Sequence, residues 1–110
     1  MHYMKLNCEP FDKIKSGAKI YELRLYDEKR KNIQIGNLIE FTKRDSDEKC
    51  TVKVTDLCRF GNFAELYANL PLEQCGYAVG EKASPTDMEA YYTKEEQRLY
   101  GVVAIKIELY

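Results

Sequence analysis

Residues 17–30 read Gly-Ala-Lys-Ile-Tyr-Glu-Leu-Arg-Leu-Tyr-Asp-Glu-Lys-Arg, and they crowd seven charges onto a segment that otherwise has the pattern of a buried β-strand. Successive side chains of a strand point to opposite faces of the sheet. Tyr21 and Leu23 therefore share one face, whereas Glu22 and Arg24 share the other. We expect the first face to pack against a core and the second face to carry a functional site.

Apolar alternation predicts further strands on both sides of this segment, at residues 4–6, 34–42, 50–60 and 103–109. Helix-start residues predict short helices, one with Pro10 in its first turn and three others after Asn62, Ser84 and Thr93. Within residues 50–60 the apolar pattern changes face near Thr55-Asp56, which predicts a β-bulge. We therefore expect an α+β fold, a curled sheet or partly open β-barrel with short helices over its ends.

The bulk composition predicts one domain over residues 1–110, because a chain of 110 residues has room for a single core. No apolar run approaches the roughly 20 residues that a membrane-spanning helix needs. The first residues lack the apolar stretch and the small-residue cleavage site of a secretory signal. We therefore expect a cytoplasmic protein that does not cross a membrane.

Neither metal ligands nor cofactor motifs stand out in the chain. The four cysteines are expected to be free thiols, and Cys50 and Cys58 would lie too far apart on one strand to pair. His2 is the only histidine and no Cys-x-x-Cys pair occurs, so we expect no metal site. Phosphate-loop, dinucleotide-binding and Gly-x-Ser-x-Gly motifs are missing, so we expect no cofactor.

Charge is unevenly distributed between the two parts of the chain. Residues 1–60 hold 13 basic and 10 acidic groups, whereas residues 61–110 hold 4 and 8. The positive part contains the charged strand and its continuation through Lys29 and Arg30, which indicates a local basic patch. The alternative is a solvated surface on which interleaved acids cancel the field.

Lys19, Glu22 and Arg24 are the candidate site residues, because a carboxylate held between two cations can orient the amino or amide edge of a ligand. Tyr26 shares the face of Glu22 and Arg24 and offers a ring on which a base can stack. Tyr91, Tyr92 and Tyr100 could line one wall of a cleft, although helical spacing favours a packing role. An exposed ion-pairing strand face without function is the alternative.

The charged strand resembles the signature of the ASCH family, Gly-x-Lys-x-x-Glu-x-Arg, through Gly17, Lys19, Glu22 and Arg24. Residues 36–41 and 100–105 are also similar to ASCH segments. The resemblance implies a PUA-like β-barrel with flanking helices, and a cleft beside the motif strand that binds RNA, a nucleotide-like ligand or a modified nucleoside. The ligand-binding residues would be Lys19, Glu22, Arg24, Tyr26, Lys29 and Arg30.

Some proteins similar to this chain are small amidohydrolases that deacetylate N4-acetylcytidine with a lysine, a threonine and a glutamate. Lys19 takes the lysine position, Glu22 stands where those enzymes have threonine, and Glu81 takes the place of their glutamate. If the chain is an enzyme, Glu22 or Glu81 would activate a water molecule and Lys19 would stabilise the oxyanion. A protein-interaction domain is a further alternative, and the sequence leaves the oligomeric state open.

Overall fold

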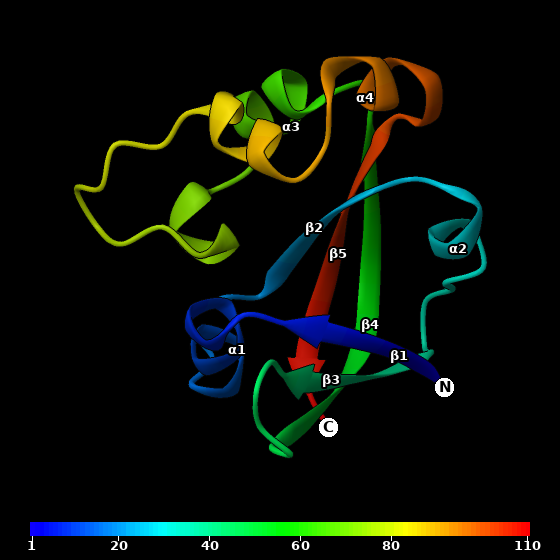
Figure 1. Ribbon diagram of the computed structural model, residues 1–110, viewed down its shortest axis with the longest axis vertical. Coiled ribbons are helices and arrows are strands. Elements are labelled where there is room, and N and C mark those ends of the chain that lie inside the picture. The colour runs from blue at the N-terminus through cyan, green and yellow to red at the C-terminus, as the bar shows by residue number, and fades with distance from the viewer.

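The computed structural model describes residues 1–110 and is built on one curled five-stranded sheet (Figure 1). The strand order is β1-β3-β4-β5-β2, with β1 parallel to β3 and every other pair antiparallel. The strands are β1 (His2–Leu6), β2 (Tyr21–Leu25), β3 (Leu38–Lys43), β4 (Lys49–Phe60) and β5 (Val102–Leu109). The sheet forms a half-barrel, so the predicted α+β class with a curled sheet is confirmed.

The curl has a local cause in β4. The register of β4 against β5 shifts between Val54 and Asp56, which is the position where the sequence predicts a bulge. A bulge increases twist and bends the strand that carries it. β4 can therefore pair with β3 through its first half and with β5 along its length while the sheet curves.

Short helices cover the two ends of the sheet (Figure 1). α3 and α4, with two 3₁₀ turns, lie over one end of β4 and β5, and α1 lies beside the other end. The elements are α1 (Cys8–Lys15), α2 (Glu28–Lys31), α3 (Phe63–Asn69), α4 (Lys94–Tyr100), η1 (Leu72–Cys75) and η2 (Pro85–Ala90). None of these helices has the length and the apolar character that a membrane span requires.

Helix starts follow the predicted caps with two differences. Thr93 and Glu96 form a reciprocal capping box at α4, as expected. Ser84 and Asp87 also form one, but the segment that they begin is a 3₁₀ turn and not an α-helix. At α3 the Asn62 side chain accepts from the backbone N–H of Glu65, whereas the Glu65 carboxylate reaches Gly61 instead of Asn62.

The core has two parts, one on each side of the sheet's curve. α1 packs Phe11 and Ile14 into the first part, with side chains from β1, β3, β4 and β5. α3 packs Phe63, Leu66 and Tyr67 into the second part, against β2 and β5. The two helices are thereby fixed on either side of β2.

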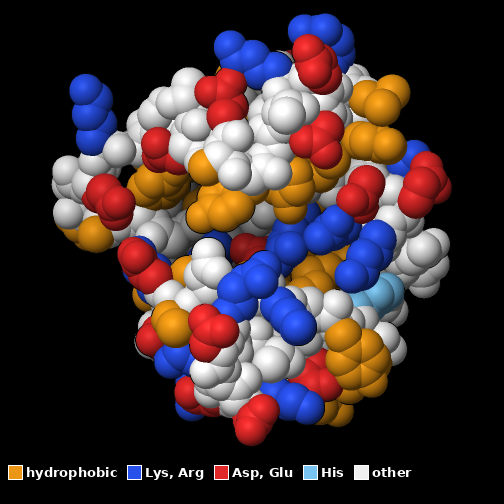
Figure 2. Space-filling view, in the orientation of Figure 1, with side chains coloured by type: hydrophobic (Ala, Val, Ile, Leu, Met, Phe, Trp, Pro, Cys, Tyr) orange, Lys and Arg blue, Asp and Glu red, His pale blue; other side chains and the backbone are white.

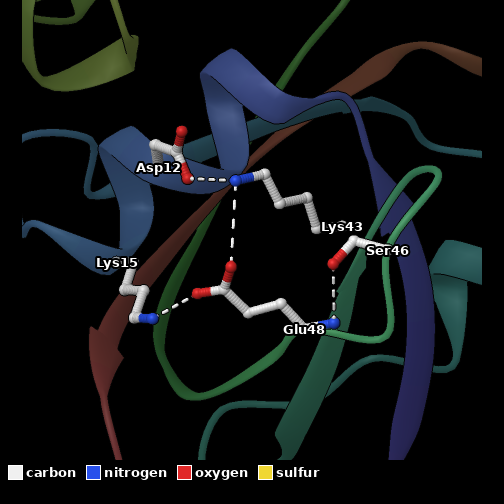
Figure 3. A network of polar contacts seen from close by, with 5 residues as sticks. All are labelled: Asp12, Lys15, Lys43, Ser46 and Glu48. Carbon is white, nitrogen blue, oxygen red and sulfur yellow. Dashed lines mark hydrogen bonds and ion pairs between the residues drawn. The ribbon is translucent and has the colours of Figure 1, made fainter.

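A polar network fixes α1 to the turn between β3 and β4 (Figure 3). Lys43 at the end of β3 lies 3.1 Å from Asp12 of α1 and 3.8 Å from Glu48. Glu48 also contacts Lys15, and its backbone N–H donates to Ser46 at 3.0 Å. Lys43 is thus neutralised by carboxylates of the same protein, and the network holds the turn that carries Arg44 in place.

Candidate functional site

A cavity of about 320 Å³ opens beside β2, between α1 and the segment that contains η1 and η2. Figure 2 shows the hollow, with basic side chains gathered beside it and apolar side chains along the rim formed by the helical layer. The lining residues come from β1, α1, β2, α3, η1, η2, the β3–β4 turn and neighbouring loops. Four tyrosines are among them, Tyr67, Tyr77, Tyr91 and Tyr92.

Glu22 is the centre of this site. Its side chain is only 4% exposed, and both carboxylate oxygens are held by cations. Lys19 Nζ lies 2.9 Å from Oε1, while Nη2 and Nε of Arg24 donate to Oε2 at 2.9 and 3.3 Å. All three residues line the cavity. The second face of β2 is therefore a buried ion triad and not an exposed ion-pairing surface.

The cations decide the charge state of the triad. Burial opposes ionisation of Glu22, but Lys19 and Arg24 together outweigh it and hold the pKa of this carboxyl below its usual range. Burial likewise opposes charge on Arg24, and Glu22 with the Tyr92 hydroxyl raises the pKa of the guanidinium above its ordinary value. Glu22 is an ionised acceptor and a weak base.

Backbone geometry places the two cations. Arg24 Nη2 lies 3.5 Å from the carbonyl oxygen of Lys5, so the guanidinium bridges the gap between β2 and β1. The side chain of Lys19 runs over Gly76, where a Cβ atom would lie 3.2 Å from Lys19 Cδ. Gly76 has φ +112°, a conformation that side chains other than glycine rarely adopt. A glycine at this position therefore opens the path by which Lys19 reaches Glu22.

A hydrogen-bonded chain orders the tyrosine wall. Tyr77 donates to Asp87 at 2.7 Å, and the hydroxyls of Tyr67 and Tyr77 lie 2.7 Å apart. Because the Tyr77 proton goes to Asp87, Tyr67 donates to Tyr77. Burial raises the pKa of Tyr77 far above its usual range, and the contacts with Tyr67 and Asp87 raise it further. Burial also raises the pKa of Tyr67, so both of these hydroxyls are held in their neutral form.

The sequence model of the family described as "ASCH domain" matches residues 4–110. The chain belongs to the ASCH domain family. Its PUA-like half-barrel is also found in two solved structures of low sequence identity. ASCH from Zymomonas mobilis is 15% identical with a TM-score of 0.68, and covers 96% of this chain and 65% of its own. The ASCH domain from Lactobacillus crispatus is 17% identical with a TM-score of 0.64, covering 98% and 79%.

Two other solved structures are more similar to this ASCH domain in sequence. The hypothetical protein PH0355 is 32% identical over 100% of both chains, with a TM-score of 0.82. Protein PF0455 from Pyrococcus furiosus is 31% identical over 98% of this chain and 96% of its own, with a TM-score of 0.71. The comparison with curated proteins gives no match.

Not all site residues predicted from the sequence of this ASCH domain lie together. Lys19, Glu22, Arg24 and Glu81 line one cavity. Glu81 is at its exposed edge, where one carboxylate oxygen accepts from the backbone N–H of Ala78 at 2.8 Å. The structure thus places the two candidate catalytic carboxylates on the same cavity.

The other three predicted ligand-binding residues lie outside the cavity. Tyr26 is beyond the end of β2, where its ring is 4.2 Å from the Arg59 guanidinium. Lys29 and Arg30 belong to α2, and Arg30 pairs with Asp27 at 2.7 Å. Contact of these residues with RNA stays a prediction, and it requires an RNA long enough to leave the cavity.

Several lining residues of this ASCH domain were missed by sequence reasoning. Lys5 and Arg44 come from β1 and the β3–β4 turn, and Tyr67 and Tyr77 come from α3 and the segment after η1. No local pattern marks these residues, because only the curl of the sheet brings the segments to one cavity. The tyrosine count was the one available signal.

Proposed function

We propose that this ASCH domain binds RNA or a nucleotide-like ligand, with one base inserted in the cavity beside β2. The observation that carries the proposal is the ionised Glu22, buried and held by Lys19 and Arg24 at the wall of a cavity rich in tyrosine. A family relationship to PUA-like domains agrees with RNA-related binding.

The triad leaves hydrogen-bonding capacity for a ligand. A carboxylate has about four acceptor positions, and Lys19 and Arg24 fill three of those on Glu22. One position on Oε1 is left for an amino or ring N–H group. The cations beside it can donate to a neighbouring ring nitrogen or carbonyl. Nucleobases whose edges combine a donor with an acceptor, such as cytosine or guanine, match this arrangement.

The shape and wall of the cavity suit one nucleoside. A volume of about 320 Å³ lies at the small end of the range for ligand sites in proteins. Tyrosine rings provide flat faces, and stacking of a base on an aromatic side chain contributes about 1–3 kcal/mol. Tyr91 is the most accessible of the lining tyrosines, with 63% of its surface exposed.

Calorimetric titration with the four ribonucleosides and N4-acetylcytidine tests this proposal. Tyr91→Ala should weaken binding by about 5- to 150-fold, which is the stacking energy expressed as affinity. Tyr3→Ala is the matched control, because Tyr3 is 64% exposed and lies outside the cavity. Absence of binding to every nucleoside and to RNA, or equal loss in both variants, would contradict the proposal.

Hydrolysis of N4-acetylcytidine-like nucleosides is a second candidate function, favoured by the position of Glu81 on the same cavity as Lys19. Glu22 is a poor base because its pKa is lowered, so Glu81 would accept a proton from the attacking water. Water adds to the acetyl carbonyl, Lys19 stabilises the oxyanion, and Glu81 passes its proton to the amide nitrogen as the C–N bond breaks, which releases acetate and the free amino group.

Chromatography of N4-acetylcytidine incubated with the protein separates the two candidates. Enzymatic turnover predicts cytidine release that disappears in Lys19→Ala and in Glu81→Gln. A binding site alone predicts that the nucleoside is recovered unchanged, with affinity that depends on Tyr91.

A further inference from the structure

Two basic side chains at the cavity have no acidic partner. Lys5 of β1 and Arg44 of the β3–β4 turn both line the cavity, and neither takes part in any ion pair of the structure. Both residues are exposed. Two unpaired cations therefore face solvent where the cavity opens.

The other basic side chains nearby are already engaged. Lys19 and Arg24 bind Glu22, and Lys13 pairs with Glu9 at 3.0 Å and donates to the Gly76 carbonyl. Lys43, next to Arg44 in the chain, is held by Asp12 and Glu48 (Figure 3). The pattern singles out Lys5 and Arg44 as free cations on this side of the molecule.

The fold brings these two cations together beside the triad. β1 and β3 are parallel neighbours, and the backbone N–H of Arg44 donates to the carbonyl of Leu6 at 2.8 Å. The Arg24 guanidinium contacts both the Glu22 carboxylate and the Lys5 carbonyl. The backbone that carries Lys5 is therefore only one guanidinium group, that of Arg24, away from the Glu22 carboxylate.

The charge balance of the cavity agrees with an anionic ligand. Five basic and three acidic residues line it, which gives a local excess of two positive charges in a chain of net charge −1. Local excess positive charge raises the concentration of an anion at the mouth. Deeper in the cavity the Glu22 carboxylate would repel the same anion.

We propose that Lys5 and Arg44 form a phosphate subsite for the ligand whose base contacts Glu22. The phosphate is either the 5′-phosphate of a free nucleotide or a phosphodiester of RNA, since both present the same oxygens to a guanidinium and an ammonium. This subsite rests on the proposed nucleotide-binding function. The basic residues of α2 are less suited to it, because none of them lines the cavity and two of them are paired, Arg30 with Asp27 and Lys31 with Glu28.

Comparison of a nucleoside with its 5′-monophosphate tests the subsite. For the wild type the monophosphate should bind about tenfold more tightly, which is the effect of one charged hydrogen bond. Lys5→Met/Arg44→Met should remove this advantage and leave nucleoside affinity within about twofold. The control is Lys53→Met/Lys94→Met, which removes two charges from exposed residues that do not line the cavity. It should keep the advantage.

A single-stranded RNA oligonucleotide distinguishes the two sources of phosphate. If RNA is the ligand, the double variant should lower the slope of log affinity against log salt by about 0.7 for each lost contact. If a free nucleotide is the ligand, the RNA slope stays unchanged while the monophosphate loses its advantage.

Two further results would overturn different claims. A nucleoside that binds as tightly as its monophosphate, or an advantage that persists in Lys5→Met/Arg44→Met, would remove the subsite and leave base binding intact. Absence of binding by nucleosides, monophosphates and RNA would remove the proposed function together with the subsite.

Discussion

Replacement of Glu22 by glutamine should destabilise the protein strongly. Glu22→Gln keeps the shape of the side chain but leaves Lys19 and Arg24, 10% and 16% exposed, without a counter-charge. Breaking a buried ion pair by removal of one partner costs about 3–5 kcal/mol. The amide oxygen of glutamine can still accept one hydrogen bond, so we expect the low end, about 3 kcal/mol. This is a large part of the roughly 5–15 kcal/mol that stabilises a domain.

The effect should depend on pH in a defined direction. The folded pKa of Glu22 is lower than the ordinary 4.5, so ionisation of this group stabilises the fold above pH 4.5. That stabilisation is lost as the pH falls through the folded pKa. The free energy of unfolding of Glu22→Gln should therefore fall furthest below that of the wild type near neutral pH. The gap between the two should become smaller below pH 4.5.

Urea unfolding at a series of pH values measures both effects. Glu108→Gln is the matched control, because Glu108 is exposed on β5 and forms no ion pair, and it should change the free energy of unfolding by less than about 0.5 kcal/mol. A loss in Glu22→Gln no larger than in Glu108→Gln would refute the reasoning, since the triad would then contribute no more than a surface charge.

Three other predictions follow from the walls of the cavity. Gly76→Ala should lower the free energy of unfolding more than Gly80→Ala, as measured by urea unfolding. Both glycines have positive φ, but only at Gly76 would the added methyl lie within 4 Å of another side chain. Equal losses in the two variants would contradict this. Tyr77→Phe should cost about 1–3 kcal/mol of unfolding free energy, because it leaves the buried hydroxyl of Tyr67 without its acceptor; a loss by urea unfolding no larger than that of the exposed Tyr3→Phe would count against the assignment. Burial raises the pKa of Cys75 from 9.0 to about 11, so alkylation followed by mass spectrometry should show it reacting at least about 100-fold more slowly than exposed Cys8, and comparable rates would exclude a buried thiol.

The strands were the elements of the fold that could be predicted best from the sequence. Alternation placed the five strands, and the displaced apolar residue in 50–60 placed the bulge, because a side-chain period of two is a local property. The four-residue helix α2 was not predicted. It is too short to show a period, and only the Asp27 cap marks its start.

The sequence predicted the site residues in and beside β2, but not those that other parts of the chain bring to the cavity. Glu22 and Arg24 share one face of β2, so their grouping needed only the strand pattern, whereas Lys19 precedes the strand and was grouped with them by its closeness in the chain. Burial of Glu22 was not visible, because periodicity does not show which distant segments, such as η1, pack beside β2. Lys5 and Arg44 reach the cavity through the parallel pairing of β1 with β3, which periodicity does not order.

Titration of the ¹⁵N-labelled protein with the tightest-binding nucleoside, followed by NMR, tests the central claim most directly. The account predicts that the largest shifts fall on the Nε–H of Arg24 and on the backbone of the cavity wall, while the outer face of β4 around Lys53 stays unchanged. Shifts that avoid Arg24, or that spread evenly over the surface, would contradict a base-binding site at the Glu22 triad.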